Sequence, residues 1–119
     1  MRFEFSTASR IVFGVGVLKE AGALAAGLGH RAFVVVGRSG ERAASLLDDL
    51  KTAGVEAVTF AVTGEPTTDL VREGTAQARV AGCDLVIGIG GGSVIDAGKA
   101  IAALLTNGGD PLDYLDTLY

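Results

Sequence analysis

The chain has 119 residues, enough for one domain that buries about two thirds of its extended surface and too few for a second core. Acidic residues outnumber basic ones by 14 to 10, and the basic residues are scattered from Arg2 to Lys99, which argues against a nucleic-acid-binding surface. The sequence shows neither a leader peptide nor an apolar run approaching the roughly 18 residues of a membrane span, so we expect a cytoplasmic protein that does not enter membranes.

The first elements are expected to form a β-hairpin followed by a helix. The alternation in Phe3–Phe5 is typical of a strand, and a second strand, Arg10–Phe13, follows after a short turn. Gly14 and Gly16 are expected to end the hairpin. Apolar residues then recur at helical spacing from Val17 to Leu28.

The rest of the chain alternates between apolar strands and helices of about a dozen residues, a pattern that predicts an α/β fold with a Rossmann-like parallel sheet flanked by helices. In such a sheet the carboxyl ends of the strands share one edge, and ligands bind there. The expected strands are Ala32–Val36, Ala57–Val62 and Asp84–Ile89, and the expected helices before the last strand are Gly40–Ala53 and Thr68–Ala81.

Three consecutive glycines, Gly90, Gly91 and Gly92, follow the last of these strands, and Ser93 is expected to open a further helix. Residues without Cβ let the backbone turn sharply and come close to a ligand, and a helix behind them offers free N–H groups and a positive dipole end, so we expect a phosphate or pyrophosphate here. Ser93 with Asp96 also fits a capping box, which is worth about 1 kcal/mol without any ligand. Capping alone does not require three glycines.

Two common phosphate motifs do not fit this spacing. Five residues separate Gly92 from Gly98 where a P-loop has four, and Lys99 is followed by Ala100 instead of serine or threonine. The dinucleotide fingerprint of glycines at the first, third and sixth positions is matched at only two of the three.

The run from Gly90 to Lys99 instead resembles the GGGSxxDxxK signature of the iron-containing (group III) alcohol dehydrogenases, a superfamily related to glycerol dehydrogenase and dehydroquinate synthase. Other landmarks resemble the same family in order and approximate spacing along nearly the whole chain. They are Phe13-Gly14-Val15-Gly16, Pro66-Thr67, Gly82-Cys83-Asp84, Asn107-Gly108-Gly109-Asp110 and Asp113-Tyr114.

This resemblance implies that residues 1–119 are the amino-terminal nucleotide-binding domain of a larger two-domain enzyme, which transfers hydride between an alcohol and NAD(P). The cofactor would be NAD or NADP. NADP is favoured weakly, because Gly37 stands where the family often has an NAD-selecting aspartate and the guanidinium of Arg38 could pair with a phosphate; a solvated Arg38 is the alternative. The expected cofactor-binding residues are Gly37, Arg38, Pro66, Thr67, Gly90, Gly91, Gly92, Ser93, Asp96 and Lys99.

The resemblance also implies a helical second domain whose aspartate and histidines bind Fe²⁺ or Zn²⁺, and this chain lacks such ligands. His30 is its one histidine and is expected at the surface, so we expect the isolated chain to be inactive. The alternative is a stand-alone, non-catalytic nucleotide-binding or assembly module. A synthase of the dehydroquinate type is a third hypothesis, against which Ser93 and Lys99 favour a dehydrogenase.

A chain cut from a larger protein would expose a sheet edge and apolar faces, so we expect self-association or a homo-oligomer. The apolar residues expected to be exposed are Ile101, Leu104, Leu105, Leu112, Leu115 and Leu118.

Overall fold

A computed structural model describes residues 2–7, 11–15, 21–37 and 40–107 of the chain. The expected start of the first helix at Val17, the start of the second strand at Arg10, and Arg38 all lie outside the described residues. The same is true of Leu112, Leu115 and Leu118.

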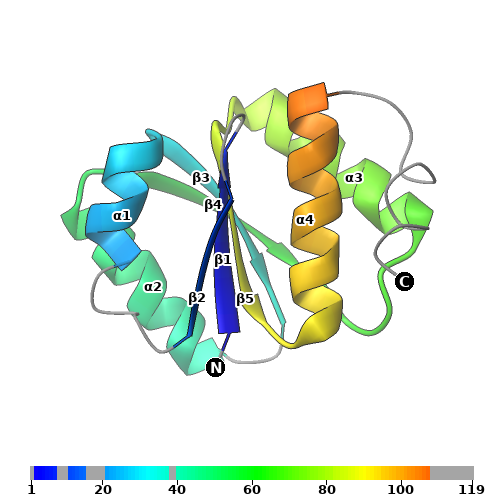
Figure 1. Ribbon diagram of the computed structural model, residues 1–119, viewed down its shortest axis with the longest axis horizontal. Coiled ribbons are helices and arrows are strands. Elements are labelled where there is room, and N and C mark those ends of the chain that lie inside the picture. The colour runs from blue at the N-terminus through cyan, green and yellow to red at the C-terminus, as the bar shows by residue number, and fades with distance from the viewer. Residues whose placement is uncertain (1, 8–10, 16–20, 38–39, 108–119) are drawn as a thin grey trace.

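The described residues form three layers, with α1 and α2 on one face of a five-stranded sheet and α3 and α4 on the other (Figure 1). The expected α/β architecture is therefore confirmed. In chain order the elements are β1 (Arg2–Thr7), β2 (Ile11–Val15), α1 (Ala21–Leu28), β3 (Arg31–Val36), α2 (Gly40–Thr52), β4 (Glu56–Ala61), α3 (Thr68–Ala81), β5 (Leu85–Gly90) and α4 (Gly92–Asn107).

The sheet has the strand order β2-β1-β5-β3-β4, and β3 runs parallel to both of its neighbours. Val36 at the end of β3 is in register with Ala61 of β4 and with Ile89 of β5. The carboxyl ends of these three strands therefore meet at one edge, as the alternation of strands and helices predicts.

The amino-terminal hairpin is also confirmed, and it belongs to the same sheet. β1 pairs antiparallel with β2 and, on its other side, antiparallel with β5. The expected end of the second strand at Phe13 is too early, because Gly14 is paired with Phe3 and the strand continues to Val15. Gly16 lies outside the described residues.

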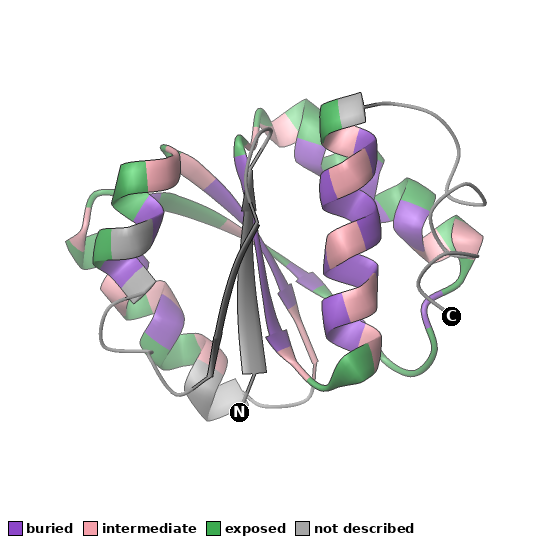
Figure 2. Cartoon of the chain, viewed as in Figure 1, coloured by how far each residue is buried: buried purple, intermediate pink, exposed green. Residues whose placement is uncertain are grey.

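Two apolar cores lie on the two faces of the sheet (Figure 2). Phe33, Phe60 and Val86 lie in the core beneath α3 and α4, where the rings of Phe33 and Phe60 stack with their centres 5.5 Å apart. The core on the other side holds Val34, Leu46, Leu50 and Ile87. These clusters account for the buried apolar positions of the parallel strands.

Three of the apolar residues that were expected to be exposed lie instead in or against the core beneath α3 and α4. Ile101 and Leu104 of α4 are completely or almost completely buried, and Leu105 is half-buried against the same core. The Nη2 atom of Arg79 on α3 donates to the carbonyl oxygen of Leu104 at 2.8 Å. The expectation of exposure is therefore wrong for these residues, because α3 covers the face of α4 that carries them.

Local signals determine both ends of α3. The Leu70 N–H donates to Oγ1 of Thr67 at 3.1 Å, so Thr67 is the N-cap. Gly82 follows the helix in the left-handed conformation, with φ 70°, and its N–H donates to the carbonyl groups of Ala78 and Arg79.

Asp84 joins the starts of β3 and β5 at the edge of the sheet opposite the strand ends. Its Oδ1 accepts the backbone N–H groups of His30 and Arg31, each at 3.0 Å, and its own N–H donates to the Arg31 carbonyl. A Cβ on Gly29 would lie 2.5 Å from this carboxylate oxygen, so only glycine leaves the approach open. The side chain of Arg31 pairs in turn with Glu56 on β4.

Replacing Asp84 by asparagine is expected to lower the free energy of unfolding by about 1 kcal/mol at pH 7, because a neutral amide oxygen makes weaker hydrogen bonds to the N–H groups of His30 and Arg31 than the charged carboxylate does. Burial by itself raises the pKa of Asp84, but the N–H groups of Arg31 and His30 outweigh it and hold the pKa below its ordinary value. The stabilisation is therefore present above the unfolded-state pKa of about 3.9 and is lost as the pH falls through the folded-state pKa.

Urea unfolding followed by circular dichroism across this pH range checks the prediction. Asp48→Asn, the same change on the exposed surface of α2, is the matched control and is expected to shift stability by less than about 0.5 kcal/mol. A deficit of Asp84→Asn that stays constant down to about pH 2 would contradict the role of the carboxylate.

Candidate functional site

The connection between β5 and α4 is a single residue, Gly91. Gly90 ends the strand with φ 152°, and a Cβ on it would lie 3.0 Å from Cγ2 of Val94. Both the backbone conformation and the packing therefore require glycine at position 90.

The helix α4 begins at Gly92, one residue earlier than expected. The Ile95 N–H donates to the carbonyl of Gly91 at 3.1 Å, which makes Gly91 the N-cap. Ser93 lies inside the first turn, so the expected capping box of Ser93 with Asp96 is wrong. The tight one-residue connection leaves no room for Ser93 before the helix.

The start of α4 supplies free hydrogen-bond donors. Because Ile95 makes the first intrahelical bond, helix geometry leaves the N–H groups of Gly92, Ser93 and Val94 without intrahelical acceptors. The dipole of this 16-residue helix adds a partial positive charge of about half a unit at the same end. This end of the helix is suited to an anion.

A cavity of about 230 Å³ lies at this end of α4, where the three parallel strands end. The loop after β3, the loop after β4 and the turn after β5 all contribute to its wall. The lining residues are Gly37, Val62, Thr63, Gly64, Gly90, Gly91, Gly92, Ser93 and Val94. All three N–H donors at the start of α4 therefore belong to residues that line one cavity.

The glycines that line the cavity differ in whether the fold requires a residue without a side chain at their position. A Cβ on Gly37 would lie 3.0 Å from Val94, which is close packing inside the protein. A Cβ on Gly91 or Gly92 would meet no atom of the described residues within 4 Å, and neither glycine has a positive φ. The fold itself does not require glycine at positions 91 and 92, so their bare backbone is available to a ligand.

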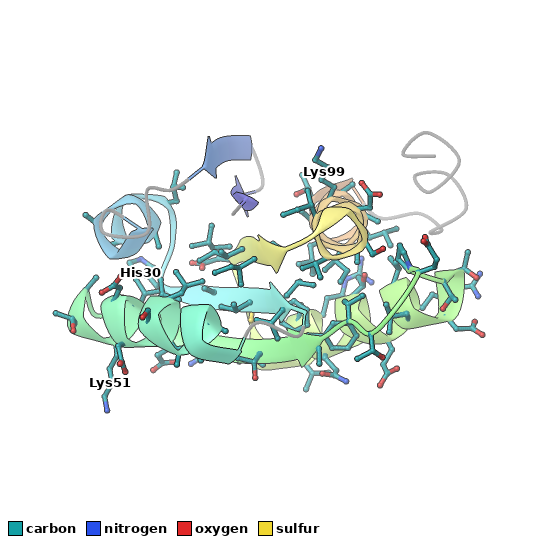
Figure 3. All side chains as sticks on the ribbon, turned by 90° about the horizontal axis from the view of Figure 1, so that it is seen from below. His30, Lys51 and Lys99 are labelled. Atoms are coloured by element: carbon teal, nitrogen blue, oxygen red, sulfur yellow. The ribbon has the colours of Figure 1, made fainter. Side chains whose placement is uncertain are left out.

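The structure brings five of the ten expected cofactor-binding residues to this cavity: Gly37, Gly90, Gly91, Gly92 and Ser93. Pro66 is buried and Thr67 caps α3, and neither lines the cavity. Asp96 and Lys99 lie farther along α4, and Figure 3 shows Lys99 on the side of that helix turned away from β3 and β4. Arg38 lies outside the described residues, and the binding roles of all ten stay predictions.

Val62 and Thr63 line the cavity although sequence reasoning did not single them out as binding residues. The signal was available, because both stand at the carboxyl end of the strand predicted over 57–62. The rule that ligands bind at this edge applies to them as it does to the glycine turn.

The described part of the chain shows neither a metal-binding cluster nor a membrane-spanning helix. Across the described ranges, no three histidine, cysteine, aspartate or glutamate side chains gather as a metal-binding group. No helix within those ranges combines the length and apolar character needed to cross a lipid bilayer.

The parallel strands, the glycine turn and the helix start define the class of α/β proteins that bind a ligand at the carboxyl edge of the sheet. Residues 8–118 match the sequence pattern of the family described as iron-containing alcohol dehydrogenase. The chain belongs to this family, and the resemblance seen in its motifs is confirmed.

Several known proteins are similar to this chain. The sulfoacetaldehyde reductase of Bilophila wadsworthia is 37% identical over 118 residues, which are 95% of this chain and 30% of that protein. The choline dehydrogenase of Bacillus subtilis is 36% identical over 117 residues, 94% of this chain and 29% of that protein. The crystal structure of NADH-dependent butanol dehydrogenase A from Thermotoga maritima superimposes with a TM-score of 0.74 at 27% identity, covering 84% of this chain and 27% of that one. The chain thus spans less than a third of the length of these relatives.

Proposed function

We propose that residues 1–119 are the NAD(P)-binding domain, and an amino-terminal part, of a larger metal-dependent alcohol dehydrogenase. The main support for this proposal is the cavity at the start of α4. It is lined by Gly92, Ser93 and Val94, whose N–H groups have no intrahelical acceptor, and by Gly91, which has no side chain to block a ligand. The family match supports it, as does the name of the Thermotoga maritima relative, which calls that enzyme NADH-dependent.

The residues present fit a dinucleotide. The pyrophosphate carries negative charge, and the start of α4 offers it several N–H donors together with the positive end of the helix dipole. Gly91 and Gly92 let its oxygens approach the backbone without meeting a side chain. When bound, the nicotinamide would supply the hydride acceptor or donor of the reaction, and the role of this chain is to hold and orient the cofactor.

The described residues do not fit Fe²⁺ or Zn²⁺, because they include no group of three candidate ligands. We therefore assign no catalytic step to this chain, and we propose that hydride transfer between an alcohol and an aldehyde or ketone belongs to the longer parent protein. A stand-alone nucleotide-binding or assembly module is the alternative. An encoded continuation with the aspartate and histidines of a metal site would distinguish the two.

Further properties belong to the same proposal. A carboxylate at the end of β3 would select NAD, but this position is occupied by Gly37. Its lack of a carboxylate supports binding of NADP as well as NAD. The low net charge and the family support a cytoplasmic enzyme. Self-association through β2 and β4, the outer strands of the sheet that the structure describes, is the remaining part of the proposal.

Titration of the ¹⁵N-labelled chain with NADPH and with NADH tests the proposal by NMR. We expect both nucleotides to shift the amide signals of Gly91, Gly92 and Ser93, and NADPH to bind at least as tightly as NADH. The absence of shifts up to millimolar nucleotide, or shifts confined to another face, would refute the assignment of this site.

A further inference from the structure

The polar side chains on the described wall of the cavity come from two different segments of the chain. Nine described residues line it, and among them only Ser93 and Thr63 carry a polar side chain. Neither hydroxyl has a hydrogen-bond partner among the residues that the structure describes. Ser93 belongs to the first turn of α4, whereas Thr63 follows β4.

The distance between the glycine turn and the loop that carries Thr63 follows from the strand order. β3 lies between β5 and β4, so two strand spacings of about 4.8 Å, or about 10 Å in total, separate the glycine turn from the loop that carries Thr63. This span exceeds one phosphate group. A pyrophosphate held at the start of α4 would therefore extend its adenosine side across Gly37 toward Thr63.

Gly37 occupies the strand end at which a carboxylate ordinarily binds the adenosine ribose, and it has no side chain to do so. We propose that Thr63 takes this part: its hydroxyl contacts the 2′ side of the adenosine ribose and determines which of the two nicotinamide cofactors is accepted. The inference rests on the proposed function, since it assumes that the pyrophosphate lies at α4.

The chemistry of the hydroxyl gives the specificity. A neutral threonine both donates and accepts, so it can bind the 2′-hydroxyl of NADH or a 2′-phosphate oxygen of NADPH. A carboxylate at the same place would accept from the 2′-hydroxyl and repel the phosphate. Thr63 thus admits both cofactors where an acidic residue would exclude one.

Dissociation constants for NADPH and NADH, measured by NMR titration of the whole chain, test this role. Thr63→Val is expected to weaken both cofactors about fivefold to tenfold, and Thr63→Ser to restore them, because one hydrogen bond is lost and regained. Thr63→Asp is expected to weaken NADPH about thirtyfold or more and to leave NADH within about threefold. Thr59 is exposed on β4 and lies outside the cavity, so Thr59→Val is the matched control and should change neither constant.

The results distinguish a failure of the role of Thr63 from a failure of cofactor binding by the chain. If Thr63→Val and Thr63→Asp bind both cofactors as the unchanged chain does, the role of Thr63 is refuted, while binding at the glycine turn stands. If the unchanged chain binds neither cofactor, the proposed function fails and the inference fails with it. An equal loss of NADH and NADPH in Thr63→Asp would also overturn the specificity role.

Discussion

Replacing Gly91 by valine is expected to raise the dissociation constants for NADPH and NADH at least about 100-fold while the fold persists. A Cβ at this position meets no atom of the described residues within 4 Å, and the backbone has no positive φ, so valine is compatible with the folded chain. Its branched side chain would stand beside the N–H donors at the start of α4. A pyrophosphate kept away from these groups loses several charge-assisted hydrogen bonds, each worth about 1.5 to 3 kcal/mol.

NMR titration gives the affinities, and far-ultraviolet circular dichroism with urea unfolding reports the fold. Gly27→Val is the matched control, because Gly27 is an exposed glycine of α1 with equally open surroundings and lies outside the cavity. It should bind both nucleotides normally. Undiminished binding by Gly91→Val would show that the cofactor does not lie at this turn.

Replacing Gly22 by alanine is expected to destabilise the chain by about 2 to 3 kcal/mol, although alanine is the better helix former. Gly22 is buried in α1, and a Cβ on it would lie 2.5 Å from the carbonyl oxygen of Asp49 and 3.3 Å from Cβ of Ala53. The first of these atoms is backbone in α2, which cannot move aside as the tip of a side chain can. The two helices would have to separate.

Gly27→Ala, in the same helix, is the matched control for Gly22→Ala. No atom of the described residues lies within 4 Å of its Cβ, so only helix propensity changes and stability should rise by about 0.5 to 1 kcal/mol. Urea unfolding curves of the two variants and the unchanged chain give the three free energies. Equal effects of the two substitutions would mean that α1 and α2 are not packed as closely as the structure indicates.

Local patterns in the sequence predicted most of the element order. The helix predicted over 68–81 and the strands predicted over 32–36 and 57–62 agree with the structure within a residue or so, because apolar periodicity and capping residues act over a few neighbouring positions. The carboxyl edge followed from the alternation of strands and helices. The motif from Gly90 to Lys99 led to the family, which the match over residues 8–118 confirms.

Long-range packing decided what these patterns leave open. The role of each glycine depends on what surrounds it: Gly90 is required by its φ and by Val94, whereas Gly91 is free of such contacts. Ile101 has the same apolar character whether it is covered or exposed, and only the position of α3 shows that it is buried.

The amino-acid sequence alone indicated the α/β class, the family and the glycine turn that follows the last parallel strand, since spacing and periodicity are properties of consecutive residues. The pairing of β1 with β5, the single-residue connection between β5 and α4 and the burial of Ile101 beneath α3 came only from the tertiary structure. These depend on which segments distant in the chain become neighbours. That choice is made by the packing of the whole domain.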